Sequence, residues 1–219
     1  MSGLALSATA LTLRYDDQLV LDTPPLAAAP GSLTVLSGAS GSGKSSLLYL
    51  LSGLARPTSG SLAWGETELS ALSEAGRDRW RRRHAGFIFQ DFHLIDEMTP
   101  LDNVLLPAWF GAWNAAPRRK RAETLLAELA VPLERRQAGL LSRGEQQRVA
   151  IARALLADPA IIFADEPTAS LDQLAGAHVI AVLSRLAAEG RTVIAASHDP
   201  DLRAAATAEL VLDHGRVNA

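Results

Sequence analysis

The residues with the clearest chemical meaning form a short glycine-rich stretch from Gly38 to Ser45, which reads Gly-Ala-Ser-Gly-Ser-Gly-Lys-Ser. This spacing fits the pattern G-x-x-x-x-G-K-[ST], in which glycines let backbone N–H groups close around a polyphosphate at the start of a helix. The lysine then lies on the phosphates, and the last serine hydroxyl reaches Mg²⁺. The sequence therefore predicts a phosphate-binding loop whose contacts come from Gly38, Ser40, Gly41, Ser42, Gly43, Lys44, Ser45 and Ser46.

Two adjacent carboxylates, Asp165 and Glu166, follow the apolar run Ala160–Ala164. Such a run fits a strand buried on both faces, and open α/β sheets bind ligands at the carboxyl ends of their strands. Alone, an Asp-Glu-Pro sequence after a strand is more typical of a solvated turn. Together with the glycine loop, it predicts that Asp165 holds Mg²⁺ beside Ser45 and that Glu166 reaches the water that attacks the terminal phosphate.

A third polar stretch, Leu141-Ser-Arg-Gly-Glu, opens a predicted helix over Ser142–Leu156. Ser142 and Glu145 fit the capping box S-x-x-E, and helix capping alone would explain that pair. A cap does not need Gly144, however, and an exposed helix N-terminus with a serine hydroxyl attracts anions. Because the glycine loop already encloses one side of a nucleotide, this second anion site favours the terminal phosphate of a nucleotide on another subunit.

These stretches lie at the boundaries of strands and helices that alternate along the chain. We expect strands at Leu33–Ser37, Phe87–Phe89, Ala160–Ala164 and Thr192–Ala196, helices at Ser45–Leu54 and Leu174–Ala188, and a terminal helix and strands. This alternation predicts an α/β fold with a mainly parallel sheet that is covered by helices on both faces.

Two segments depart from this alternation. Residues 5–20 resemble two antiparallel strands that turn at Asp16-Asp17, which predicts an N-terminal antiparallel β layer. Residues 91–140 show helical spacing interrupted by Pro100, Pro107, Pro117 and Pro132, which predicts a helical insert. We therefore expect a single domain over residues 1–219, with a core from 1–90 and 141–219 and a helical subdomain from 91–140 that packs with the helix from Ser142.

The composition is that of an ordinary globular protein. The 219 residues are 48% hydrophobic and 21% charged, and they include no cysteine, which excludes disulfides and thiolate chemistry. No apolar run approaches the roughly 18–20 residues of a membrane-spanning helix, and no secretion signal is expected. The net charge of −3 argues against nucleic-acid binding. The basic runs at 79–83 and 118–121 favour solvated helix faces, with anionic lipid or an acidic partner as alternatives.

Along nearly its whole length the chain resembles an ATP-binding cassette (ABC) ATPase. Besides the two phosphate-binding motifs, the resemblance rests on Tyr15, Gln90, the Ser-Leu-Asp sequence that ends at Asp172, and His198 in Ala-Ser-His-Asp. It implies a P-loop NTPase core that binds ATP and Mg²⁺. It also implies that Tyr15 stacks on adenine, that Gln90 contacts Mg²⁺ and the attacking water, that Asp172 bridges two subunits, and that His198 contacts the γ-phosphate.

The signature stretch departs from the family pattern Leu-Ser-Gly-Gly-Gln at Arg143 and Glu145. Ser142 and Gly144, the expected phosphate contacts, are retained. The Arg143 side chain either lies away from the nucleotide without consequence or alters contacts with the γ-phosphate of the other subunit. The intact Glu166 and His198 favour the first alternative.

The resemblance predicts a homodimer in which each ATP lies between the glycine loop of one subunit and residues 142–145 of the other. ATP binding favours the closed dimer, because only that state satisfies the γ-phosphate from both sides. Catalysis is then expected from Lys44 and Mg²⁺, which offset phosphate charge, and from Glu166, which orients or deprotonates water, with Gln90 and His198 beside them.

The stretch from Gly86 to Leu94, followed by Leu101–Pro107, is similar to the lipoprotein-release and macrolide-export branch of these ATPases. That resemblance implies a peripheral subunit at the cytoplasmic face of the inner membrane, which drives a separate permease for lipoproteins, peptides or drugs. We expect the permease to dock in a groove beside the insert, near Phe92, His93, Leu94, Met98, Trp109, Phe110 and Trp113.

Two other functions fit the same ATP chemistry. One is a regulatory ATPase that acts on a membrane partner in cell division and transports nothing. The other is a soluble cassette in DNA repair or translation, which the lack of a long coiled-coil insert and of a second cassette in the sequence disfavours.

Overall fold

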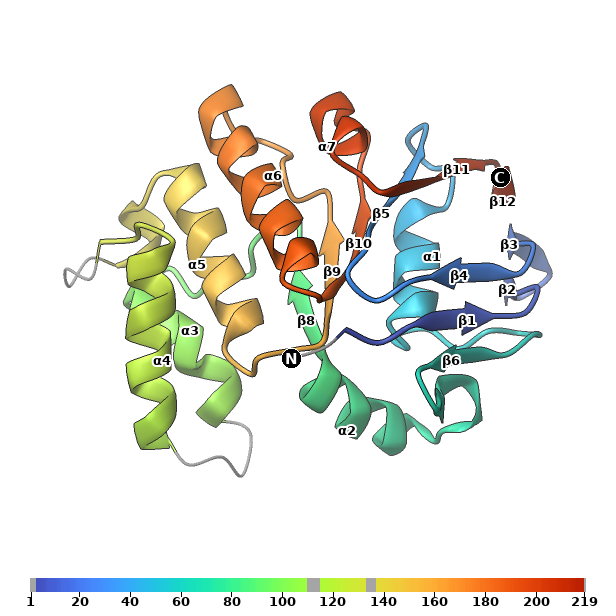
Figure 1. Cartoon of the computed structure of the whole chain (residues 1–219), viewed down its shortest axis with the longest axis horizontal. Coiled ribbons are helices and arrows are strands. Elements are labelled where there is room, and N and C mark those ends of the chain that lie inside the picture. Colours follow the sequence, from blue (N-terminus) through green and yellow to red (C-terminus); the bar gives the residue numbers. More distant parts are fainter. Residues whose placement is uncertain (1–2, 110–114, 133–136, 219) are drawn as a thin grey trace.

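Eight strands form the main sheet (Figure 1), in a computed structural model that describes residues 3–109, 115–132 and 137–218. In chain order they are β2 (Thr12–Tyr15), β3 (Gln18–Asp22), β5 (Leu33–Gly38), β8 (Ala85–Ile88), β9 (Ile161–Asp165), β10 (Thr192–Ala196), β11 (Ala208–Asp213) and β12 (Arg216–Asn218). Across the sheet their order is β2-β3-β12-β11-β5-β10-β9-β8. β11, β5, β10, β9 and β8 run parallel, whereas β2 pairs antiparallel with β3, and β12 with β11.

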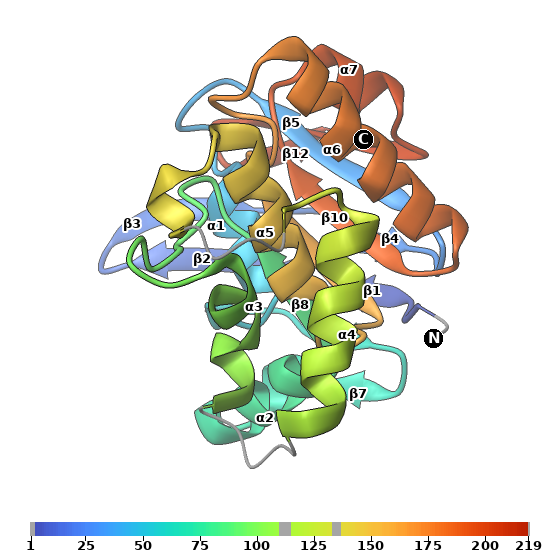
Figure 2. The ribbon, with the colours of Figure 1, turned by 90° about the vertical axis from the view of Figure 1, so that its left-hand side faces the viewer.

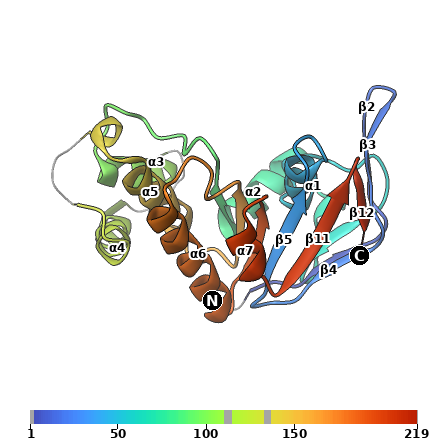
Figure 3. The same cartoon turned by 90° about the horizontal axis from the view of Figure 1, so that it is seen from above.

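The central strands are apolar on both faces. β9 and β10 are buried at every residue, as is β5 up to Ser37. Val35 and Ile162 share one cluster with α5 (Arg143–Leu155), α6 (Gln173–Ala188) and α7 (Pro200–Ala204). Leu36 and Phe163 share another with α1 (Lys44–Leu51). α1 and α6 thus lie on opposite sides of β5 (Figure 3), and the predicted parallel sheet between helices is confirmed.

A second, antiparallel sheet shares the hydrophobic cluster around α1. It contains β1 (Leu6–Ala8), β4 (Leu26–Ala28), β6 (Leu62–Trp64) and β7 (Thr67–Glu68), in the order β4-β1-β6-β7. The predicted turn at Asp16-Asp17 joins β2 and β3, but the expectation of only two strands in residues 5–20 is wrong. The chain changes sheet at Leu11. Its N–H donates to the Thr23 hydroxyl (3.2 Å) instead of to a strand, and its side chain is completely buried.

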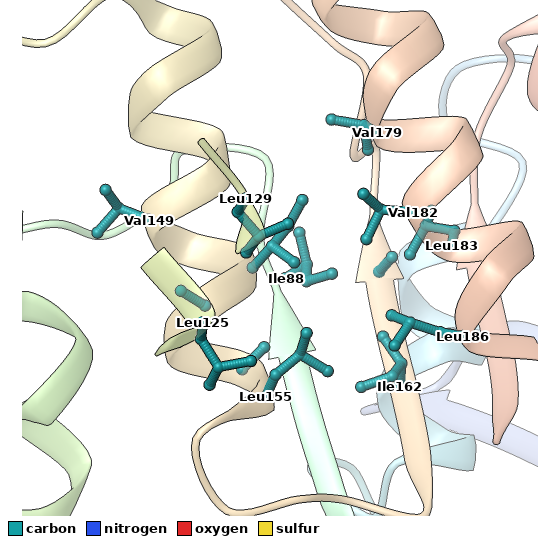
Figure 4. Packing of buried hydrophobic residues seen from close by; sticks show 14 of the residues in the cluster. Ile88, Leu125, Leu129, Val149, Leu155, Ile162, Val179, Val182, Leu183 and Leu186 are labelled. Carbon is teal, nitrogen blue, oxygen red and sulfur yellow. The ribbon is translucent and has the colours of Figure 1, made fainter. Parts of the chain in front are cut away.

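The helical segment packs on α5 (Figure 2) and consists of α3 (Pro100–Trp109), α4 (Ala115–Glu128) and the 3-10 helix η2 (Ala138–Leu140). Pro100 begins α3, whereas Pro107 lies inside it and does not end it. Leu125 of α4, Leu155 of α5 and Ile88 of β8 belong to one hydrophobic cluster (Figure 4). The segment is therefore attached to the core through the helix that begins after the Ser142 cap.

The basic run at 79–83, expected on a helix face, lies in α2 (Glu74–His84), but no sequence pattern predicted the bounds of α2 or the 3-10 helix η1 (Leu69–Ala71). In α2 only Trp80 is buried, so the helix lacks the apolar stripe that reveals an amphipathic helix. Its basic run is also more than a solvated face, because Arg81 donates to the Gly53 carbonyl oxygen. Arg121 of α4 likewise pairs with Asp158 (3.0 Å). In the part of the chain that the structure describes, no helix is both long and apolar enough to cross a membrane.

Candidate nucleotide site

The glycine loop connects the buried strand β5 to α1. β5 ends at Gly38 (φ 142°), and Gly43 (φ 102°) precedes α1. A Cβ atom on Gly38 would lie 2.2 Å from the Leu212 carbonyl oxygen, so only glycine permits the observed approach of β11. Among the described residues no side chain caps α1, which leaves its first N–H groups available to an anion.

Lys44 is buried inside this loop. Its ammonium donates to the carbonyl oxygens of Gly38 and Ala39, both at 3.0 Å, and lies 4.0 Å from Glu166 Oε1. A buried ammonium requires compensating partners. Here the partners are the two carbonyl groups and the Glu166 carboxylate. They hold the ammonium in a fixed position, where it can bind a phosphate.

Ser45 and Asp165 come from distant parts of the sequence and meet at the loop. Ser45 Oγ donates to Asp165 Oδ1 (2.9 Å), and the Tyr49 hydroxyl donates to Oδ2 (3.2 Å). Burial raises the pKa of Asp165, and Glu166 raises it further, against the hydrogen bonds and the charge of Lys44. Burial and the nearby Asp165 also raise the pKa of Tyr49. Tyr49 was not predicted, although its position four residues after Ser45 on one helix was an available signal.

Glu166 is fixed at the end of β9 by the neighbouring strand. Its N–H donates to the Ala196 carbonyl oxygen (2.8 Å), and its backbone is left-handed, with φ 44°. Its Oε2 lies 3.0 Å from His198 Nδ1 and accepts from the Ser197 hydroxyl at 3.3 Å. Non-glycine residues in this conformation cluster at functional sites. The buried Ser197 was missed, because a serine after a strand has no distinctive pattern.

A cavity of about 460 Å³ lies over the loop; we call it the nucleotide cavity. Its lining comprises Gln18, Leu19, Val20, Ser40, Gly41, Gly43, Lys44, Ser45, Ser46, Gln90, Glu166, His214 and Gly215. Most of the predicted loop residues are therefore brought together with Gln90 and Glu166. Tyr15 does not line the cavity; it is 56% exposed and pairs with Gln18 across the β2–β3 hairpin. The residues on β3 and in the β11–β12 turn were not predicted.

The second anion site contributes nothing to the lining of this cavity. Ser142 caps α5 in a complete capping box: its hydroxyl accepts from the Glu145 N–H (3.3 Å), and its own N–H donates to Glu145 Oε2 (2.8 Å). The Ser142 hydroxyl also donates to Glu145 Oε2 (2.9 Å). The Arg143 guanidinium lies over the Phe92 ring, 4.7 Å from its centre. A Cβ on Gly144 would lie 3.0 Å from a side-chain carbon of α6, so this glycine lets the two helices approach.

Asp172 and Gln147 connect the neighbouring elements. The Asp172 carboxylate accepts from the Ala175 N–H (2.8 Å) and so caps α6. The buried Gln147 of α5 donates to the Pro167 carbonyl oxygen at 2.5 Å. Because Pro167 follows Glu166 directly, this hydrogen bond joins α5 to the segment that carries Glu166. Gln147 was not predicted.

A family model described as ABC transporter matches residues 21–169. The chain belongs to the ABC transporter family. The matched range includes the glycine loop, Gln90, the Ser142 cap, Asp165 and Glu166. The chain is therefore an ABC ATPase cassette, as its sequence motifs indicated.

Relatives of the cassette include proteins of two kinds. It is 41% identical over 222 residues to the macrolide export ATP-binding/permease protein MacB of Burkholderia pseudomallei (strain 1710b). That alignment covers 99% of this chain and 34% of MacB. It is 43% identical over 191 residues to the lipoprotein-releasing system ATP-binding protein LolD of Syntrophotalea carbinolica. That alignment covers 85% of this chain and 83% of LolD. The chain thus spans about a third of the length of MacB, and the predicted branch is confirmed.

Solved cassettes share the fold. The dimeric post-hydrolysis structure of the cassette MJ0796 bound to ADP and Pi matches with a TM-score of 0.87 and 33% identity, over 98% of this chain and 97% of that chain. Another dimeric structure of MJ0796 matches with a TM-score of 0.88 and 34% identity over the same shares.

The cassette has a second cavity, of about 490 Å³, which we call the α2–α3 groove. Its lining comprises Arg81, Arg82, Ala85, Gly86, Phe87, Phe89, His93, Leu106, Pro107, Arg153, Ala154, Leu156 and Ala157. The groove is therefore apolar with three guanidinium groups, and none of the described residues that line it is acidic.

The groove differs from the predicted one in its residues. Of the predicted set, His93 lines it, whereas Phe92 is 3% exposed and packs under Arg143. Trp109 is 51% exposed and lies outside the lining. Phe110 and Trp113 lie outside the described residues. The predicted residues were chosen because they have large side chains. The groove is instead formed where β8 and α2 meet α3 and α5.

Proposed function

We propose that the cassette binds ATP with Mg²⁺, hydrolyses it, and dimerises on ATP to drive a separate membrane permease. The observation that carries this proposal is the meeting of Lys44, Ser45, Asp165 and Glu166 beside one cavity. Phosphoryl transfer depends on positioning and charge stabilisation more than on covalent chemistry by the protein. The Lys44 ammonium, the N-terminus of α1 and the carboxylates of Asp165 and Glu166 can supply both the positioning and the charge stabilisation.

Ser45, Asp165 and Gln90 are the proposed ligands of Mg²⁺. All offer oxygen atoms, which Mg²⁺ prefers, and the ion is commonly held by one or two carboxylates together with substrate phosphates. The Ser45 and Asp165 oxygens are 2.9 Å apart, and Gln90 lines the nucleotide cavity. The bound ion would offset charge on the phosphate oxygens. Tyr49 holds the other Asp165 oxygen and thereby orients the carboxylate.

Glu166 is the proposed base, or the residue that orients the attacking water. Its backbone is tied to β10, and its carboxylate is held by Ser197 and His198. The His198 side chain is 73% exposed while its Nδ1 touches Glu166, which supports a contact between its ring and the γ-phosphate. These contacts fix the Glu166 carboxylate before nucleotide binds, and such preorganisation lowers the activation barrier for hydrolysis.

Two copies of the chain are proposed to enclose two ATP molecules. Ser142 and Arg143 are exposed, and residues 142–145 do not line the cavity of their own subunit, as expected if they bind the nucleotide of a partner copy. Asp172 is also exposed and is assigned to the dimer contact. The dimeric structures of MJ0796 support this arrangement.

The permease is proposed to dock in the α2–α3 groove, whose apolar walls and arginines suit a short amphipathic helix. LolD is named for lipoprotein release, and MacB is named as an export ATP-binding/permease protein. We therefore infer that the cassette works at the cytoplasmic face of the inner membrane and drives extraction or export of lipoproteins, peptides or drugs.

Glu166→Gln tests the ATP-dependent part of this function. The variant should retain ATP and form a stable dimer with Mg-ATP, seen as a doubled mass in analytical ultracentrifugation, and should remain monomeric without nucleotide. Normal hydrolysis by this variant would remove Glu166 from its role. The tagged variant, purified with ATP from gently solubilised native membranes, then identifies its partner by mass spectrometry. A permease supports transport, a cell-division membrane protein supports the regulatory alternative, and no membrane protein contradicts membrane coupling.

A further inference from the structure

One end of the nucleotide cavity is formed by residues that belong to none of the phosphate-binding motifs. These residues are Gln18, Leu19 and Val20 on β3, with His214 and Gly215 between β11 and β12. In the sheet, β3 and β12 lie on one side of β5, whereas β9 and β8 lie on the other. The cavity therefore extends across the glycine loop from one side of the sheet to the other.

The two ends of the cavity have different chemistry. Glu166, which follows β9, and Gln90, which follows β8, belong to the end where the terminal phosphate reacts. A nucleotide whose terminal phosphate lies there and whose phosphate chain crosses the loop must extend its ribose and base toward β3 and β12. His214 lies at that end.

The turn that carries His214 is fixed to the glycine loop. Asp213 pairs with Arg216, so His214 and Gly215 form a two-residue turn, and both have positive φ, 44° and 80°. The Gly215 N–H donates to the Ser42 carbonyl oxygen at 2.9 Å. A Cβ on Gly215 would lie 2.1 Å from the Val20 carbonyl oxygen, so the turn also packs tightly on β3.

The His214 ring itself is not held by packing. Its side chain is 96% exposed, and its Nε2 lies 3.7 Å from the exposed Asp213 carboxylate. The first position of such a turn usually holds asparagine or aspartate. A histidine there, beside the cavity and with nothing packed around it, serves no structural purpose that the turn requires.

We propose that His214 is a nucleotide-binding residue that contacts the ribose or base of the nucleotide, through ring stacking or a hydrogen bond from the imidazole. The inference rests on the proposed function, because it presupposes that the cavity binds ATP. It assigns a role to the β11–β12 turn, which packs on β3 and comes from the C-terminal part of the chain.

His214→Asn tests this contact without disturbing the turn, because asparagine is the residue such turns favour. Titration calorimetry with Mg²⁺ compares two ligands, ATP and inorganic triphosphate, which lacks the ribose and base. The matched control is His178→Asn, an exposed histidine on α6 that does not line the cavity. Thermal unfolding of each variant checks that the fold is retained.

The variant His214→Asn should raise the Kd of ATP by about fivefold, equivalent to about 1 kcal/mol, and leave the Kd of inorganic triphosphate unchanged. The control should change neither. An unchanged Kd for ATP in His214→Asn would overturn the inference, and so would an equal loss for both ligands, which would place the effect on the phosphates. Failure of the wild-type protein to bind ATP would instead overturn the proposed function.

Discussion

The N-termini of α1 and α5 both offer N–H groups to an anion, but they differ in how complete a site each makes. α1 opens into a cavity with a buried ammonium, Lys44, and two carboxylates within reach. α5 opens at the surface, and its capping serine, Ser142, is already bonded in both directions to Glu145. One terminus forms a site within a single chain, whereas the other is satisfied internally until something outside competes for it.

In the proposed dimer, this difference explains how one chain could bind nucleotide alone and still require a second copy to close the site. A helix N-terminus attracts an anion with only about 0.3–1 kcal/mol at an exposed site. At α1 the lysine charge and burial add to that attraction. At α5 the carboxylate of Glu145 opposes it, so only a phosphate presented at short range by a partner subunit is expected to displace the internal hydrogen bonds.

Lys44→Ala should separate the two sites most strongly. Loss of the ammonium removes charge-assisted bonds to the phosphates, and we expect the affinity for ATP to fall by about 100-fold or more. Ser142→Ala should leave the affinity of the isolated subunit within about twofold. Titration calorimetry of both variants measures this contrast, with thermal unfolding to verify that Lys44→Ala still folds. Equal losses would show that the two termini act on one nucleotide in one chain.

Ser142→Ala should act instead on association. In a Glu166→Gln background, we expect the ATP-dependent dimer to weaken by about tenfold, because each of two sites loses a hydroxyl contact with phosphate. Sedimentation across a concentration series with Mg-ATP gives the dissociation constant of the dimer.

The cap itself supplies the control for that experiment. Ser142→Ala also removes a helix cap, which costs about 1 kcal/mol of stability. Ser73 caps α2 in the same manner, by accepting from the Gly76 N–H. Ser73→Ala should therefore lower the free energy of unfolding by a similar amount and leave the dimer unchanged. If Ser73→Ala weakened the dimer equally, the effect of Ser142→Ala would be one of stability.

The comparison also shows what local sequence can predict. The loop before α1 and the capping box before α5 are continuous stretches, so their geometry follows from neighbouring residues. The approach of Ser45 to Asp165 follows from strands whose carboxyl ends share one edge of the sheet. The placement of β1 in a separate sheet and of His214 beside the glycine loop depends on pairings between distant segments. No local pattern encodes them. The basic run at 79–83 indicated a helix face, but the bounds of α2 could not be predicted because only Trp80 of this helix is buried.

Arg143 provides the smallest and most selective test. Its guanidinium lies over the Phe92 ring, in the segment after Gln90, and this contact holds the side chain in place. We therefore expect Arg143→Gln to change ATP turnover by less than about tenfold, a shift of less than about 1.4 kcal/mol in the barrier. It should lower the free energy of unfolding by about 0.5–1 kcal/mol, the usual value of such a contact.

A double-mutant cycle with Phe92→Leu shows whether Arg143 acts through the ring or through its charge. If it acts through the ring, Arg143→Gln has almost no further effect on unfolding once Phe92 is replaced, because the contact is already gone. Arg143→Lys keeps the charge but loses the planar stacking group, so it should behave like Arg143→Gln in denaturant unfolding. A tenfold or larger rise in turnover in Arg143→Gln that persists in the Phe92→Leu background would instead show that the arginine charge reaches the phosphate of the partner subunit. The exposed terminus of α5 would then be electrostatically coupled to the nucleotide, and the contrast with α1 would be one of degree.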